Sequence, residues 1–309
     1  MSENPRRRLR QLLEQPGVLI APGVTNAFHA KLAEKAGFKV IFTTGAGIAN
    51  TMLGMPDIGL TTMTEIVGMT RYIAEAVQIP VIADADTGYG NHLNVLRTVR
   101  DMERAGVAAM TLEDQVSPKR CGHFAGKSVV SIQEMVEKLV AATMARQDPD
   151  LVLVARTDAL AVEGLESALE RARAYVAAGA DVIFVEAPRT REQMEAVPRS
   201  LPAPCLINMV EGGLTPLLPA EELAQMGYKL AVYANLALRA SAQAVQRAFA
   251  VLRRAGTSQP VMHEILPWEE RQELIGLPQW QEVDVTIADA AQRVLQEMDG
   301  GVSTESRRR

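Results

Sequence analysis

Short apolar runs alternate with longer amphipathic stretches along most of the chain, and this alternation most constrains its fold. The runs are rich in Val, Ile and Leu, as expected for strands buried on both faces of a parallel sheet. Eight such strands, each followed by a helix or a long loop, predict an α/β fold of the (β/α)₈ TIM-barrel type. The runs occupy residues 18–22, 39–44, 80–86, 108–114, 151–158, 182–188, 204–209 and 229–235.

The stretches between the runs have helical periodicity. Residues 166–180, for example, carry apolar side chains at steps of three and four. Several of these stretches end in Ala-Gly just before the next run, where glycine suits the left-handed position after a helix. An open doubly wound sheet is the alternative architecture, but no glycine-rich dinucleotide-binding fingerprint follows the first run.

The alternation ends near residue 255, which suggests how the chain is divided. We expect residues 1–257 to form the barrel with an N-terminal helix. Residues 258–309 are expected to form a C-terminal helical extension that ends in a frayed basic tail. Such an extension could cover a surface of the barrel or reach a neighbouring subunit.

Composition argues against several classes of function. The net charge of −5 is unlike the basic excess of a nucleic-acid-binding surface. No apolar run approaches the ~20 residues that span a bilayer, and no apolar stretch follows the basic N-terminus as it would in a signal peptide. We therefore expect a cytoplasmic protein that binds neither nucleic acid nor membrane.

Polar residues gather where the expected strands end. In parallel barrels the active site lies at these C-terminal ends. Polarity often begins at a strand end, but acids on three central strands facing an arginine on another favour a functional site. The residues are Thr43 to Gly47, Asp84, Asp86, Glu113, Asp114, Arg156 to Asp158, Glu186, Asn208, Tyr233 and Asn235.

Asp84 and Asp86 leave the same face of their strand because they are two residues apart. Two adjacent carboxylates repel each other unless a proton or a cation lies between them. With Glu113 nearby they form an oxygen-rich site suited to a hard cation such as Mg²⁺ or Mn²⁺. A carboxylate pair that does acid–base work without metal is the alternative. The sequence has no histidine pair with the spacing of zinc ligands.

Two features could hold a substrate carboxylate. The small-residue turn Thr44-Gly45-Ala46-Gly47 would let backbone N–H groups approach an anion closely. Arg156 offers a forked cation, which could also form an ion pair with Asp158 or Glu186.

The chain has two cysteines in different surroundings. Cys205 lies in an apolar segment and is expected to be buried and inert. Cys121 is flanked by Lys119, Arg120 and His123 in a long polar stretch that is typical of a lid at the functional end of a barrel. Neighbouring cations are expected to lower its pKa from the reference near ~8.5, which would suit a nucleophile or an acid–base group.

Several ordered segments resemble the isocitrate lyase and phosphoenolpyruvate mutase superfamily. The most specific is KRCGHFAGK at 119–127, which is similar to the signature loop of isocitrate and 2-methylisocitrate lyases. The other matching segments are TTGAGIANTMLGMPDIG (43–59), DADTGYGN (84–91), TLEDQVSPKRCGH (111–123), VARTDA (154–159) and NMVEGGLTP (208–216).

The resemblance implies a carbon–carbon lyase, an oxo-acid-lyase, with roles for individual residues. Asp57, Asp84, Asp86 and Glu113 would hold Mg²⁺, some through water. Thr44, Gly45, Ala46 and Arg156 would bind the carboxylate of a small carboxylic acid. Cys121 would be the acid, supported by Lys119, Arg120 and His123, while Glu186 and Asn208 would face the rest of the substrate. The resemblance also implies a homotetramer whose C-terminal helix is exchanged between subunits.

The match is looser around the substrate. Val210 stands where the lyases for isocitrate and 2-methylisocitrate carry a hydroxyl residue, so the segment looks more like 2,3-dimethylmalate lyase. Ala234 and Asn235 also depart from the family pattern. We therefore expect Mg²⁺-dependent cleavage of a 2-hydroxy dicarboxylic acid, of the 2-alkylmalate or 2-methylisocitrate type, to pyruvate or glyoxylate plus a carboxylic acid. A carboxyphosphoenolpyruvate-type phosphonomutase, an oxaloacetate-processing enzyme and a non-catalytic acid sensor remain alternatives.

Overall fold

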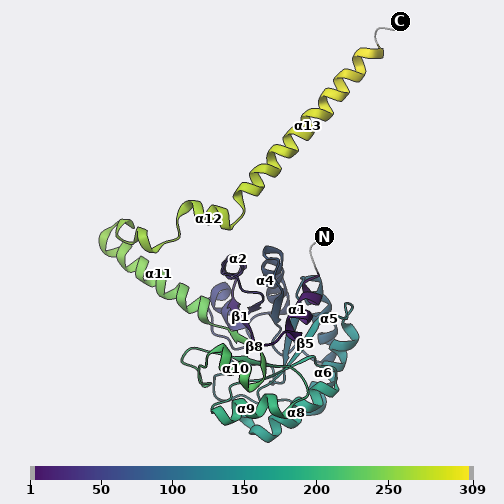
Figure 1. The fold of residues 1–309 in the computed structure, drawn as a ribbon, viewed down its shortest axis with the longest axis vertical. Helices are drawn as coiled ribbons and strands as arrows, with labels where there is room; N and C mark the ends of the chain where they lie inside the picture. Colours follow the sequence, from purple (N-terminus) through teal and green to yellow (C-terminus); the bar gives the residue numbers. More distant parts are fainter. Residues whose placement is uncertain (1–3, 306–309) are drawn as a thin grey trace. The chain divides into compact units, whose positions relative to one another are not determined.

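A computed structural model of the chain describes residues 4–305 and their side chains up to residue 298. It contains eight parallel strands that close into a barrel in sequence order, with β8 pairing back onto β1. Figure 1 shows the helices of residues 5–226 arranged around this barrel. The predicted (β/α)₈ architecture is confirmed.

Each predicted apolar run overlaps one strand, although β1 ends two residues after its run and β8 begins one residue before its run. Most observed strands are one to three residues shorter than the run, because the runs include polar residues past the last ladder hydrogen bond. The strands are β1 (Leu19–Val24), β2 (Ile41–Thr43), β3 (Val81–Asp84), β4 (Ala109–Glu113), β5 (Val152–Thr157), β6 (Val182–Val185), β7 (Cys205–Asn208) and β8 (Tyr228–Tyr233).

Helices follow the strands in the expected alternation. Around the barrel they are α1 (Pro5–Glu14), α2 (Ala27–Lys35), α3 (Gly45–Ile48), the π-helical turn η1 (Ala49–Leu53), α4 (Met63–Ala76), α5 (His92–Arg104), α6 (Ile132–Ala145), α7 (Ala159–Val162), α8 (Leu165–Ala177), α9 (Arg191–Ser200) and α10 (Ala220–Met226). The remainder are α11 (Leu236–Ala255), the 3₁₀ turn η2 (Gln259–Glu264), α12 (Trp268–Leu274) and α13 (Leu277–Glu305).

Local sequence fixes where several of these helices begin and end. Thr62 and Glu65 form a reciprocal capping box at the start of α4, which satisfies two otherwise free backbone N–H groups. Gly106 and Gly179 have φ values of 88° and 102° just after α5 and α8. The left-handed glycines predicted at helix ends are therefore confirmed.

Side-chain alternation along the strands separates two apolar layers. Inward-facing residues such as Phe42, Phe184 and Val232 fill the barrel interior, and outward-facing residues pack under the helices. Leu9 of α1 is fully buried and belongs to the interior cluster. The N-terminal helix therefore extends the packed interior of the barrel.

The chain divides into two compact units, residues 1–246 and 247–309, and the division falls within the sequence of α11. The boundary predicted from sequence, at residue 257, marks where the strand–helix alternation ends. It does not coincide with the division between the two compact units. In the second unit Arg247 pairs with Glu264 at 2.6 Å, and the Arg271 guanidinium stacks on Trp268. The exchange of α13 between subunits stays a prediction, and the end of the basic tail lies outside the described residues.

Among the helices of residues 4–305, none is both long enough and apolar enough to cross a bilayer.

Replacing Leu9 tests how much α1 contributes to the barrel. Leu9→Ala is expected to lower the free energy of unfolding by about 2–5 kcal/mol, because it leaves a cavity in a fully buried apolar cluster. Urea unfolding followed by circular dichroism measures the change. Leu93→Ala, at a leucine of α5 that is 62% exposed, is the matched control and should change stability little. Equal stability of Leu9→Ala and the parent would contradict a packing role for α1.

Candidate active site

Two adjacent cavities lie at the C-terminal ends of the strands. An inner cavity of about 40 Å³ sits on Phe42, Phe184 and Val232, which form the top of the barrel interior. An outer cavity of about 520 Å³ lies beside it, within the usual size range of small-molecule sites. The residues that line both are Ala46, Asp57, Cys121, His123, Val210 and Asn235.

The polar residues come together because each lies two positions after an inward-facing apolar residue of its strand. On β5, Arg156 lies two residues after the inward-facing Val154, and on β6, Glu186 follows Phe184 in the same way. A strand repeats every two residues, so each such side chain continues the inward row beyond the apolar core. The polar residues of these rows that line the inner cavity are Thr44, Asp84, Arg156, Glu186 and Asn208.

A lysine from the loop after β4 lies among the predicted metal ligands. The Lys119 ammonium is 2.5 Å from Asp57 Oδ1 and 2.8 Å from Asp86 Oδ1, and its side chain is 5% exposed. Asp84 accepts hydrogen bonds instead, at 3.1 Å from the Gly45 N–H and at 3.2 Å from the Thr111 hydroxyl. Asp57 and Asp86 thus share one position that already accommodates a positive charge, and Asp84 lies beside it, accepting the Asp86 N–H at 3.2 Å.

Burial changes the acidity of this cluster. It raises the pKa of Asp86 to about 6, in the same direction as the nearby Asp84 and Asp57 and against the attraction of Lys119. It also raises the pKa of Glu113 well above its ordinary value, although Arg156 acts in the opposite direction. For both carboxyl groups, the nearby positive charges therefore do not compensate for the loss of solvation on burial.

Arg156 is held by three carboxylates. Its guanidinium lies 3.2 Å from Glu113, 3.4 Å from Glu186 and 2.9 Å from Asp158. It also stacks on the Phe184 ring, 5.2 Å from the ring centroid. Burial alone would lower the pKa of this group, but the carboxylates outweigh it and raise the pKa. Arg156 is thus a fixed cation facing the inner cavity.

The turn after β2 is shaped for close approach. The Thr44 hydroxyl accepts the N–H of Gly47 at 3.2 Å, which starts the short helix α3. A Cβ on Gly45 would lie 2.8 Å from Asp84 Oδ2, so glycine is needed here for the turn to reach the carboxylate. Ala46 lines both cavities.

The loop that carries Cys121 closes over the inner cavity. The Cys121 N–H donates to the carbonyl of Asp57 at 3.2 Å. The Leu214 N–H donates to His123 Nδ1 at 3.1 Å, so the ring proton resides on Nε2, which lies 3.2 Å from Glu186. His123 therefore links the loop to the end of β6.

Burial raises the pKa of the Cys121 thiol above its ordinary value. The hydrogen bond with the backbone of His123 and the charge of Arg156 act in the opposite direction without reversing this effect. The prediction that neighbouring cations lower this pKa is therefore wrong, because Lys119 is directed toward carboxylates and the thiol is mostly withdrawn from water. A protonated thiol is suited to donate a proton rather than to attack as a thiolate.

Other predicted residues are placed as follows. The buried Asn208 Oδ1 lines the inner cavity and has no hydrogen-bond partner among the described residues. Arg120 does not join the site: its side chain is exposed, and its guanidinium lies 3.5 Å from the carbonyl of Ala125. Cys205 is buried, as expected, and burial raises its pKa to about 12.

Sequence reasoning did not assign a role to Lys127 or a firm one to Asp158. The Lys127 ammonium lies 2.7 Å from Asp158 Oδ1, and both side chains are almost fully buried. Lys127 belongs to the loop motif and Asp158 follows Arg156 by one strand period, but nothing in their spacing shows that they meet.

Comparison with known proteins places this geometry in a family. Residues 9–253 match the family model described as phosphoenolpyruvate phosphomutase. The chain is 44% identical to the 2,3-dimethylmalate lyase of Eubacterium barkeri, over 92% of this chain and 99% of the relative. It is 42% identical to the 2-methylisocitrate lyase of Aeropyrum pernix, over 95% and 94% of the two chains.

Solved structures show the same fold. The structure of oxaloacetate acetylhydrolase in complex with 3,3-difluorooxalacetate has a TM-score of 0.88 and 37% identity, and the match covers 92% of this chain and 97% of that one. A phosphonopyruvate hydrolase complex with oxalate and Mg²⁺ has a TM-score of 0.83 and 34% identity, covering 92% and 99%. The chain therefore belongs to the phosphoenolpyruvate mutase and isocitrate lyase superfamily, as an enzyme related to its carbon–carbon lyases.

Proposed function

We propose that this enzyme is a Mg²⁺-dependent lyase that cleaves the C2–C3 bond of a 2-hydroxy dicarboxylic acid of the 2-alkylmalate type. The products would be a 2-oxo acid that keeps the 2-alkyl group, which is pyruvate for a 2-methyl substrate, and a monocarboxylic acid. The observation that carries the proposal is that the loop thiol of Cys121 lines the same small cavity as the carboxylates of Asp57 and Asp84. The similarity to 2,3-dimethylmalate lyase supports the choice of reaction.

The acidic residues fit a hard cation. Asp57 and Asp86 already hold the Lys119 ammonium between them, and the buried Glu113 Oε1 has no hydrogen-bond partner in the described part of the chain. Among the described residues, no three His, Cys, Asp or Glu side chains converge as a complete ligand set. This suits Mg²⁺, which typically takes one or two carboxylates and fills its shell with waters and substrate oxygens.

Asp57, Asp84, Asp86 and Glu113 would hold the ion, some through water, and Mn²⁺ could replace it. When bound, the ion would withdraw charge from the 2-hydroxyl and the adjacent carboxylate of the substrate. Arg156 would bind that carboxylate together with the turn at Thr44, Gly45 and Ala46. The bridge from Lys119 to Asp57 and Asp86 places a second positive charge on the same side of the cavity.

The proposed reaction balances without a co-reactant. The 2-hydroxyl loses its proton to the carboxylate cluster, a carbonyl forms at C2, and the C2–C3 bond breaks. The electron pair remains on C3, conjugated with its carboxylate, and the Cys121 thiol donates a proton to that carbon. His123 and Lys119 stabilise the developing negative charge, and the closed loop excludes water that would compete for the carbanion.

The cavity walls favour an alkyl substituent over a third carboxylate. Val210 is 9% exposed and lines both cavities, and it offers no hydrogen-bond donor. A carboxylate placed against it would lose solvation without gaining a partner. Leu214 and Phe124 extend the apolar wall in the outer cavity. We therefore prefer a malate-type substrate to 2-methylisocitrate.

A substrate panel tests the proposed reaction directly. The enzyme is expected to release a 2-oxo acid from 2-methylmalate and 2,3-dimethylmalate in the presence of Mg²⁺, measured by coupling to lactate dehydrogenase and NADH. Excess chelator should abolish the release, and 2-methylisocitrate should be a poorer substrate. Turnover of oxaloacetate or of a phosphonate in preference to every malate would instead support the hydrolase or mutase chemistry of other family members. Undiminished activity in chelator would exclude the metal.

Removing the thiol tests its role as the acid. Cys121→Ser should lower kcat by about 10²–10⁴-fold, because a hydroxyl is a much weaker proton donor, while oxalate binding in the presence of Mg²⁺ is retained. Steady-state kinetics and isothermal titration calorimetry measure the two effects. Cys205→Ala, at the buried cysteine of β7, is the control and should keep full activity. A Cys121→Ser enzyme with unchanged kcat would exclude this thiol as the acid.

The carboxylate cluster can be tested through binding alone. Asp86→Asn is expected to remove the enhancement of oxalate binding by Mg²⁺, as followed by calorimetry with and without the ion. Even outer-shell changes typically cost about 10–100-fold in metal affinity, so losing a ligand should cost at least as much. Glu75→Gln, on a side chain that is 60% exposed in α4, serves as the matched control. An Mg²⁺ effect of parental size in Asp86→Asn would contradict the assignment of this ligand.

A further inference from the structure

The loop between β4 and α6 has a fixed base and a long tip. At the base, Gln115 and Val129 form an antiparallel bridge, and the Val116 N–H donates to the Ser128 carbonyl at 2.9 Å. The tip between them carries Cys121 and has no strand or helix of its own. Apart from the hydrogen bond between the Cys121 N–H and the Asp57 carbonyl, the tip is therefore kept against the barrel by individual side chains.

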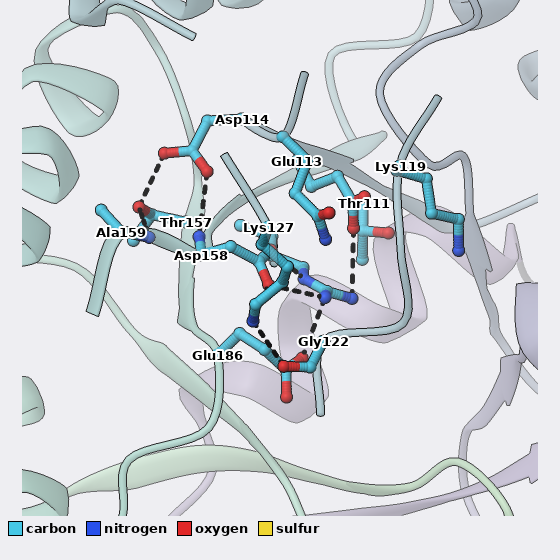
Figure 2. Close-up of polar contacts among 12 residues, drawn as sticks. Thr111, Glu113, Asp114, Lys119, Gly122, Lys127, Thr157, Asp158, Ala159 and Glu186 are labelled. Carbon is cyan, nitrogen blue, oxygen red and sulfur yellow. Dashed lines mark hydrogen bonds and ion pairs between the residues drawn. The ribbon is translucent and has the colours of Figure 1, made fainter. Parts of the chain in front are cut away.

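Lys127 stands where the tip meets the base, and its side chain is 2% exposed. Its ammonium donates to the carbonyl of Gly122 and lies 2.7 Å from Asp158 Oδ1 (Figure 2). One acceptor belongs to the loop tip and the other follows the end of β5. A buried ammonium needs such partners because desolvation otherwise disfavours its charge. Lys127 thus joins the tip to the barrel.

Asp158 is a rigid and charged anchor for this lysine. Its backbone N–H donates to Asp114 Oδ1 at 2.9 Å, and the neighbouring Thr157 hydroxyl donates to Asp114 Oδ2 at 2.7 Å. Burial would raise the pKa of the Asp158 carboxyl, but Arg156 and Lys127 outweigh it and lower the pKa. The carboxylate therefore remains ionised and in place.

The same carboxylate orients Arg156. The guanidinium donates from Nε to Asp158 Oδ2 at 2.9 Å and from Nη2 to Oδ1 at 3.1 Å. Oδ1 is thus shared between the barrel arginine and the loop lysine. Any shift of Asp158 would therefore change the positions of both Arg156 on the barrel and Lys127 on the loop.

The loop backbone rests directly on Arg156. A Cβ on Gly122 would lie 2.5 Å from Arg156 Nη2 and 2.5 Å from Glu186 Cγ, closer than a real Cβ comes to any atom. Only glycine lets the tip come so near, and Gly122 is the residue whose carbonyl Lys127 holds. Cys121, which lines both cavities, is the residue immediately before Gly122.

We propose that Lys127 is a positioning residue for the proton donor. By joining Asp158 to the carbonyl of Gly122, it holds the loop tip on Arg156 and keeps Cys121 at the boundary of the two cavities. The catalytic consequence rests on the proposed lyase reaction, whereas the holding of the loop does not. Because Asp158 serves both Lys127 and Arg156, closure of the loop and orientation of the carboxylate-binding arginine are coupled.

Alkylation of Cys121 in the full-length protein tests the holding of the loop without requiring any substrate. Lys127→Met keeps the unbranched shape of the side chain, one atom shorter, and removes its charge. We expect Cys121 to react with iodoacetamide about tenfold faster, because a charge-assisted contact is lost. Lys127→Arg should restore a rate close to that of the parent. Peptide mass spectrometry measures the rate, and the buried Cys205 reports in the same sample on any general loosening.

Kinetics with the accepted malate test the catalytic consequence. Lys127→Met should lower kcat about tenfold or more and change KM much less, since the lysine does not line the cavity and Arg156 keeps its contacts with Glu113 and Glu186. Lys39→Met is the matched control, on an exposed lysine just before β2 at the opposite end of the barrel, and should match the parent in both assays. If no acid is turned over by the parent, the lyase proposal fails while alkylation alone decides the role of Lys127.

Gly122→Ala provides a second route if Lys127→Met does not fold. Its added methyl group should push the tip away from Arg156 and accelerate Cys121 alkylation while Lys127 is still present. Parental rates of alkylation and turnover in Lys127→Met would overturn the proposal. The proposal would also be wrong if the substitution accelerated alkylation of Cys205 by the same factor as that of Cys121. If only Gly122→Ala folds, a parental rate of Cys121 alkylation in that variant would contradict it.

Discussion

The site depends on an excess of negative over positive charge among side chains that are largely buried from solvent. Six carboxylates stand at or beside the mouth of the barrel, on Asp57, Asp84, Asp86, Glu113, Asp158 and Glu186. The fixed cations that face them are Lys119, Lys127 and Arg156. Burial raises the pKa of Asp86 and Glu113 because the cations do not fully offset the lost solvation. Such a site would attract a divalent cation, and also a loop that carries positive charge.

Two of the three cations come from the loop, which makes its closure an electrostatic event as well as a steric one. Lys119 reaches the carboxylates near β3, and Lys127 reaches Asp158 beyond β5. Between them, Gly122 lets the backbone lie on Arg156 without a side chain in the way. The barrel thus supplies an acidic rim and a single arginine, and the loop supplies the charges that complete it. Moving the loop would expose several carboxylates to one another at once.

Much of this arrangement could be predicted from sequence, and the reason is periodicity. Buried parallel strands must be apolar along their length, so all eight were visible as runs, and polar residues at their ends had to lie at one rim. Contacts between the loop and the barrel carry no such periodic signal. The direction of Lys119, the exposure of Arg120 and the meeting of Lys127 with Asp158 depend on the path of the loop. The acidity of Cys121 was misjudged for the same reason, because adjacent cations in sequence point elsewhere in space.

The high pKa of Cys121 is better suited to the proposed reaction than the low one expected from sequence. A carbanion at C3 must receive a proton, and a thiol that is already ionised cannot give one. Burial, which raises this pKa, results from the closed position of the loop, where the Cys121 N–H is bonded to the Asp57 carbonyl. With the loop away from the barrel, the thiol would stand in water beside Lys119 and Arg120, conditions that favour the thiolate. Closing of the loop would therefore favour the protonated thiol and at the same time exclude water from the cavity.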